Sequence, residues 1–148
     1  MSYDVSDHPQ GGRFVGSEHR YALRVFFEDT DVGGVVYHAN YLRFMERARS
    51  DMLRLLDIDQ RGTIDAGEGV YAVAELSIRY RRPAKLDDAL VVVSKVTQIR
   101  GASCHIHQTV RRGDESLSEA DVVVAFLTTD GRPKRQPRAW VERFERLL

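Results

Sequence analysis

The chain has 148 residues, of which 22 are acidic and 22 basic, so its formal net charge is zero and no basic field favours non-specific binding to nucleic acid. Apolar residues make up 43% and charged residues 30%, which is typical of one folded domain and not of a disordered chain. No apolar run approaches the ~20 residues that cross a bilayer, so we expect no transmembrane segment.

The amino-terminal residues 1–20 are expected to form a flexible segment, followed by one domain over residues 21–148. The segment is polar, shows no hydrophobic periodicity and lacks the apolar core of a signal peptide. Cys104 is the single cysteine, so no internal disulfide can form, which fits a reducing compartment. We therefore expect a cytoplasmic protein.

The first predicted elements are a strand and a long helix. Residues 21–27 are apolar and β-branched, which predicts the strand. From Tyr41 to Leu56, apolar side chains recur at i, i+3, i+4 and i+7, which predicts an amphipathic helix with Asn40 as a candidate N-cap. Gly62 and Gly67 then indicate a loop.

The second half of the chain is rich in strands. Short turns separate the strands, and Pro137 predicts the start of a short C-terminal helix. Because sequential hairpins favour an antiparallel sheet, and an amphipathic helix needs an apolar partner, we expect a five-stranded α+β domain with the helix packed on the sheet. The later predicted strands are residues 70–82, 89–99, 104–110 and 120–129.

The segment between the first strand and the helix has the densest set of reactive side chains. Glu28, Asp29 and Asp31 lie within four positions, and His38 follows near the helix start. A helix start offers unpaired N–H groups that can hold an oxyanion, and a carboxylate can activate water or attack a carbonyl, as thioester hydrolysis requires. A purely structural interpretation is also open, because carboxylates ahead of helices act as caps and dipole partners.

The segment from Phe27 to Leu42, together with Phe44 and residues 46–49, resembles the signature of the Tol-Pal-associated acyl-CoA thioesterases. These belong to the 4-hydroxybenzoyl-CoA thioesterase family of hotdog proteins, and the run from Tyr80 to Asp88 resembles another family segment. The resemblance implies a hotdog fold, in which a five-stranded antiparallel sheet wraps around one long helix. It also implies homodimers or homotetramers with the active site at the subunit interface, and no cofactor.

The same resemblance assigns roles to residues of this segment. It implies that Asp31 is the catalytic carboxylate, as general base or nucleophile, and that His38 or its backbone N–H binds or polarises the thioester. Val36 and Tyr37 are expected to contact the substrate. Close relatives often carry a tyrosine at the position of Phe27, which has no hydroxyl and can only pack. The expected substrate is an acyl-CoA or acyl carrier protein thioester, hydrolysed to free acid and thiol.

Two basic stretches are candidates for binding the phosphates of coenzyme A. One contains Arg82, and the other contains Lys134 and Arg135. Arg and Lys are the natural partners of phosphate, but ordinary solvated loops have the same composition, and the sequence favours neither interpretation.

Several other side chains have a structural interpretation that competes with a functional one. Asp29 is a second candidate carboxylate, and Glu46 a third, although a solvated or ion-paired glutamate is favoured at this helix position. His105 and His107 share one face of a strand, but no third ligand is apparent, so no metal site is expected. Cys104 is expected to be a buried, inert thiol.

Two further functions remain open. A hotdog hydratase or dehydratase would use a different arrangement of histidine and acid, which is not found here. A non-catalytic module that binds acyl thioesters or proteins is the other alternative, since fold does not fix function.

Overall fold

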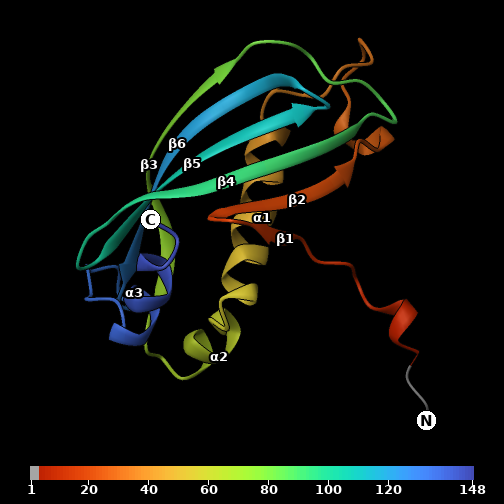
Figure 1. Cartoon of the computed structure of the whole chain (residues 1–148). Helices are drawn as coiled ribbons and strands as arrows, with labels where there is room; N and C mark the ends of the chain where they lie inside the picture. The colour runs from red at the N-terminus through yellow and green to blue at the C-terminus, as the bar shows by residue number, and fades with distance from the viewer. Residues whose placement is uncertain (1–3) are drawn as a thin grey trace.

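The computed structural model describes residues 4–148 and contains one antiparallel sheet and one long helix (Figure 1). Four shorter helices accompany them, two 3-10 helices and two further α-helices. In chain order the elements are η1 (Val5–Asp7), β1 (Arg13–Val15), β2 (Glu18–Arg24), η2 (Phe27–Asp29), α1 (Asn40–Leu55), α2 (Gln60–Asp65), β3 (Val70–Tyr80), β4 (Ala89–Ile99), β5 (Ser103–Arg112), β6 (Glu115–Leu127) and α3 (Arg138–Glu145).

The six strands follow the order β1-β2-β4-β5-β6-β3, and every neighbouring pair is antiparallel. The sheet curves around α1, as Figure 1 shows, so the expected hotdog architecture is confirmed. Strands β4, β5 and β6 form the predicted hairpins. The sheet has six strands and not five, because β1 adds a short outer strand to β2. Strand β3 pairs with β6 and leaves its other edge open.

The core lies between α1 and the concave face of the sheet. Phe44, Met45 and Ala48 are fully buried on the helix and belong to one apolar cluster with Val92 and Val110 of the sheet. Burial of side chains the size of Phe44 and Met45 contributes about 1.5–3 kcal/mol each, so the helix is held by its apolar face more than by its intrinsic propensity.

The prediction of little regular structure before residue 21 is wrong for residues 13–20. Residues 13–15 form β1, and β2 begins at Glu18. The reason is non-local: His19 is fully buried opposite Ser94 of β4, and its Nε2 lies 2.6 Å from Oδ2 of Asp51 on α1. The part of the prediction that concerns residues 1–3 lies outside the described residues.

Three local predictions also need correction. Asn40 is the first residue of α1 and not its N-cap, because its Nδ2 donates to the backbone oxygen of Asp29 at 2.8 Å. Leu55, assigned to the apolar stripe, is 42% exposed. The predicted loop after α1 contains the helix α2, whose N-cap Asp59 accepts from the N–H of Gly62 at 3.0 Å.

Across residues 4–148, no helix combines the length and apolar character needed to span a membrane.

Candidate active site

The segment ahead of α1 folds into a tight hairpin-like loop. Thr30 pairs with Val36, and the N–H of Asp31 donates to the oxygen of Val35 at 2.8 Å. The N–H of Gly34 closes a turn on the oxygen of Asp31 at 3.1 Å, with φ of +83°, a conformation that glycine adopts without strain. The loop therefore presents Asp31 at its exposed tip.

Asp31 is held in place by its backbone, and half of its carboxylate stays unused. Its Oδ1 accepts from the N–H of Gly33 at 2.8 Å. In the part of the chain that the structure describes, its Oδ2 has no hydrogen-bond partner. A carboxylate that is exposed, fixed on one oxygen and open on the other can take a proton from water or attack a carbonyl carbon.

Asp29, two residues earlier, has the opposite environment. It is only 8% exposed, and its Oδ2 accepts from the N–H of Phe26 at 2.8 Å. Its backbone oxygen accepts from the N–H of Tyr37 at 2.9 Å and from Nδ2 of Asn40 at 2.8 Å. Asp29 therefore connects the base of the loop to the helix start. The sequence did not distinguish this structural role of Asp29 from the exposed position of Asp31.

The start of α1 offers unused N–H groups. Within residues 4–148, the backbone N–H groups of His38 and Ala39 have no acceptor. They lie at the positive end of the helix dipole, where a developing oxyanion is stabilised. The backbone oxygen of His38 accepts from the hydroxyl of Tyr80 on β3 at 2.9 Å, which ties the helix start to the sheet.

His38 lines a small cavity of 240 Å³ between the loop and the end of β3. Its ring lies 4.6 Å from that of Tyr37 and 6.1 Å from that of Tyr80, measured between centroids. Burial raises the pKa of the Tyr80 hydroxyl, so it is a neutral hydrogen-bond donor at neutral pH. Besides His38 and Tyr80, the cavity is lined by Val36, Tyr41, Arg81, Arg82 and Pro83.

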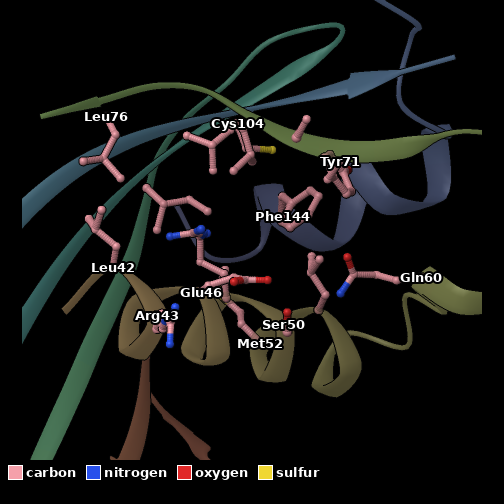
Figure 2. A pocket seen from close by; sticks show the side chains of 16 residues that line it. Leu42, Arg43, Glu46, Ser50, Met52, Gln60, Tyr71, Leu76, Cys104 and Phe144 are labelled. Atoms are coloured by element: carbon pink, nitrogen blue, oxygen red, sulfur yellow. The ribbon is translucent and has the colours of Figure 1, made fainter. Parts of the chain in front are cut away.

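A larger cavity of 510 Å³ follows the seam between α1 and the strands β3, β5 and β6. It begins at Leu42, about one helical turn after His38. Figure 2 shows Arg43, Glu46 and Ser50 on α1, on the opposite side of the cavity from the labelled side chains of the strands and of α3. Most of the lining is apolar: Leu42, Met52, Leu53, Ala72, Val73, Leu76, Ile106, Val124 and Phe144. A cavity of this size and character suits a small-molecule group.

The structure brings together only some of the residues that the sequence proposed for binding. Val36 and Arg82 lie with His38 in the small cavity, and Tyr37 packs beside it. The Nη1 of Arg82 is 3.0 Å from Oε2 of Glu115, so this guanidinium is already paired at the surface.

Lys134 and Arg135 lie elsewhere. The N–H of Lys134 donates to the oxygen of Phe126, near the end of β6, and its Nζ donates to the oxygen of Glu68. Arg82 is paired with the first residue of β6, so the two basic stretches are about 36 Å apart along that strand. Within one chain they cannot form a single phosphate site.

The remaining candidates have plain environments. Glu46 is exposed, lines the larger cavity and forms no ion pair with any described residue. His107 pairs with Asp121 at 2.9 Å, and residues 4–148 contain no group of three potential metal ligands. Cys104 is fully buried, as predicted, and burial raises the pKa of its thiol to about 12, so the thiol is neutral.

Sequence reasoning missed Tyr80 as a functional residue, and it placed Arg49 among the polar positions of the helix as a possible ion-pair partner of Glu46. Tyr80 contacts His38 across 42 positions, and no local pattern could reveal that contact. Arg49 is nine-tenths buried on α1, and only its i+4 spacing from the buried Met45 places it on the inner face of the helix.

Comparisons with known proteins identify the family. A family model described as the thioesterase superfamily matches residues 33–119. The acyl-CoA thioesterase YbgC of Haemophilus influenzae is 44% identical over 107 residues, which cover 72% of this chain and 79% of the relative. The acyl-CoA thioester hydrolase YbgC of Escherichia coli O6:H1 is 37% identical over 128 residues, covering 85% of this chain and 95% of the relative. The crystal structure of a probable thioesterase from Bartonella henselae superposes with a TM-score of 0.77 at 32% identity, over 81% of this chain and 99% of that one. The chain belongs to the thioesterase superfamily.

Proposed function

We propose that this chain hydrolyses acyl-CoA to free acid and coenzyme A, with Asp31 as the catalytic carboxylate. One observation carries the assignment of the residue: Asp31 is exposed at the tip of a fixed loop, with Oδ2 unpaired among the described residues. Family membership, and relatives of 37–44% identity that are named acyl-CoA thioesterase or thioester hydrolase, make the chain a thioester hydrolase.

In the proposed reaction, the thioester carbonyl oxygen lies at the unused N–H groups of His38 and Ala39. Asp31 removes a proton from a water that attacks the carbonyl carbon, or its own oxygen attacks to form an anhydride that water then hydrolyses. In either route the C–S bond breaks and the thiolate of coenzyme A leaves. The water that is consumed supplies its oxygen to the acid and a proton to the thiolate. The N–H groups stabilise the negative charge that develops on the carbonyl oxygen.

We also propose that two copies pair through the open edge of β3 to form the active unit. An eleven-residue strand with an unpaired edge is a template for another strand. The loop region ahead of α1 also exposes a group of large apolar side chains, of which Phe27 is 80% exposed. A second copy would cover these apolar side chains and keep bulk water from the thioester. The other members of the group are Phe26, Val32 and Tyr37.

The pairing is tested by substituting Ala74, which lies in a bulge and has no register partner on β6. Ala74→Pro removes the backbone N–H of a β3 residue that has no register partner on β6, and Ala74→Ser keeps that N–H as a matched control. Light scattering coupled to size exclusion should give dimers or tetramers for wild type and Ala74→Ser, and a monomer with little activity for Ala74→Pro. An assembled, fully active Ala74→Pro protein would exclude β3 as the interface.

The catalytic proposal is tested by thiol release from short, long and aromatic acyl-CoAs and from an acyl carrier protein thioester. Asp31→Asn keeps the shape of the side chain and should lower the turnover of the best substrate by roughly 100-fold or more. If Asp31→Asn matches wild type, Asp31 is the wrong residue, and Glu46 is the next to substitute. If wild type releases no thiol from any of them, the non-catalytic binding module replaces the enzyme.

Release from the carrier protein but not from any acyl-CoA would reassign the substrate. We further propose a cytoplasmic setting, because the single cysteine, Cys104, is a free thiol, which fits a reducing compartment.

A further inference from the structure

The larger cavity contains a buried positive charge that the proposed hydrolysis does not use. Arg49 lines the cavity and is only 9% exposed. Its Nη1 donates to Oε1 of Gln108 at 2.9 Å, which is its single hydrogen bond within residues 4–148, and no carboxylate of those residues forms an ion pair with it. A guanidinium has five N–H donors, so most of its capacity is unused.

The support of Arg49 is built into the core. Gln108 is fully buried, and its Nε2 donates to the oxygen of Met45 at 3.0 Å and to Oγ of Ser94 at 2.9 Å. These bonds fix the amide so that its oxygen faces Arg49. None of the guanidinium nitrogens is a fully enclosed, unbonded atom, so the unused donors keep contact with the cavity.

The charges around the cavity favour one negative charge inside it. Arg43, Glu46 and Arg49 are its charged side chains, and they sum to one positive charge. Burial lowers the pKa of Arg49, and the nearby Glu46 carboxylate opposes that effect. A buried guanidinium with a single neutral partner is costly, and a ligand carboxylate would offset that cost through paired N–H···O bonds.

We propose that the larger cavity binds an acyl group that ends in a carboxylate, held by Arg49, so that the preferred substrate is the coenzyme A thioester of a dicarboxylic acid. This inference rests on the proposed thioester hydrolysis. Arg49 lies nine residues after Asn40, about 14 Å along the helix axis, and its guanidinium contacts Gln108, which also bonds the oxygen of Met45, about one turn nearer the helix start. The thioester at His38 and the carboxylate at Arg49 are thus joined by a chain of medium length along the apolar seam.

The experiment compares thiol release from two matched pairs, hexanoyl-CoA with adipyl-CoA and octanoyl-CoA with suberyl-CoA. Each pair has one carbon chain and differs in the terminal carboxylate. Wild type should prefer the carboxylated member of at least one pair by roughly 10-fold or more in kcat/KM, because a site built to bond a polar group discriminates against an analogue that lacks it. Arg49→Gln should remove that preference, with a fall of roughly 10- to 100-fold on the carboxylated substrate.

Two variants sharpen the comparison. Arg47→Gln removes the same charge from an exposed position of α1 that does not line the cavity, and it should keep the preference. Glu46→Gln removes a negative charge from the cavity and should increase the preference. If Arg49→Gln does not fold by circular dichroism, Arg49→Lys replaces it, and a lysine, which lacks the bidentate fork, should reduce the preference.

The outcomes separate this inference from the proposed function. If wild type hydrolyses the plain member of both pairs as well as the carboxylated one, the inference is overturned and the thioesterase stands. If wild type releases no thiol from any thioester, the proposed function fails. Calorimetric measurement of adipyl-CoA and hexanoyl-CoA binding then tests whether the cavity binds a terminal carboxylate. Tighter adipyl-CoA binding that Arg49→Gln abolishes supports the carboxylate site, and equal binding overturns it.

Discussion

The polar groups ahead of α1 and the buried pair of His19 and Asp51 differ in how much of their hydrogen-bonding capacity the fold uses. Ahead of the helix, the exposed Asp31 keeps its Oδ2 unpaired, and the N–H groups of His38 and Ala39 have no acceptor within residues 4–148. By contrast, His19 and Asp51 are buried and bonded to each other. Aspartate and histidine thus serve two purposes. Hydrogen-bonding groups that the fold leaves unpaired are available to a substrate, and groups that are paired within the fold hold the helix on the sheet.

The largest expected loss of stability follows from breaking the buried pair. Oδ2 of Asp51 accepts from His19 and, at 2.8 Å, from the N–H of Gly12. Asp51→Ala leaves Nε2 of His19 unpaired in addition to Nδ1, which already lacks a partner among the described residues. The cost should be about 3 kcal/mol, or about 10 °C in a chain of this length.

Thermal unfolding followed by circular dichroism measures that loss, with Asp51→Asn as the milder control, since its amide oxygen can still accept one bond. The folded fraction of Asp51→Ala should hydrolyse thioesters nearly as wild type does. If Asp51→Ala has normal stability but has lost activity, Asp51 serves the reaction and not the fold, which contradicts this comparison.

A smaller effect is expected where the two regions meet. Tyr80→Phe removes only the hydroxyl that donates to the backbone oxygen of His38. A hydrogen bond of this kind contributes about 0.5–1.5 kcal/mol, so kcat/KM should fall roughly 3- to 10-fold as the helix start loosens. Steady-state kinetics measure this, and Tyr21→Phe, which removes a tyrosine hydroxyl on β2 that lines neither of the two cavities, is the matched control. Equal losses in both variants would remove any special role for Tyr80.

The smallest effect concerns the loop that supports the active-site segment. The N–H of Lys85, and then the guanidinium of Arg112, hold the pKa of the Asp88 carboxyl below its ordinary value. The carboxylate therefore adds stability above the unfolded pKa of about 3.9, and this stability is lost as the pH falls through the lower folded value. Asp88→Asn should cost about 0.5–1 kcal/mol at pH 6.

Urea unfolding at several pH values follows this contribution. The difference between wild type and Asp88→Asn should shrink between pH 4 and pH 2. A difference that stays constant over that range would show that the carboxylate charge contributes nothing.

Local patterns predicted those parts of the fold that local interactions determine. The β-branched run of residues 89–99 gave β4 its observed bounds, and the helical stripe gave α1 to within one residue. The start of β2 was missed because Glu18, His19 and Arg20 carry no apolar alternation, and only pairing with β4 and the bond to Asp51 makes them a strand. Such contacts join positions about 30 to 75 apart, which no local periodicity encodes.

The candidate site shows the same limit. The segment around Asp31 was apparent from its residue types and its family resemblance. The structural role of Asp29 became clear only from its burial and from its hydrogen bond with the N–H of Phe26. The sequence offered two separate basic stretches as phosphate sites, and the distance between them could not be judged from it because that distance depends on the length of β6. The cavity at Arg49 exists only where α1 and β3 meet.

The most direct test of the central claim is the turnover of Asp31→Asn, measured by thiol release beside its thermal unfolding midpoint. The account predicts a fall in kcat of roughly 100-fold or more with an unchanged midpoint, because Asp31 is exposed and bonded only within its own loop. An unchanged kcat, or a loss of activity that a lowered midpoint fully explains, would contradict it.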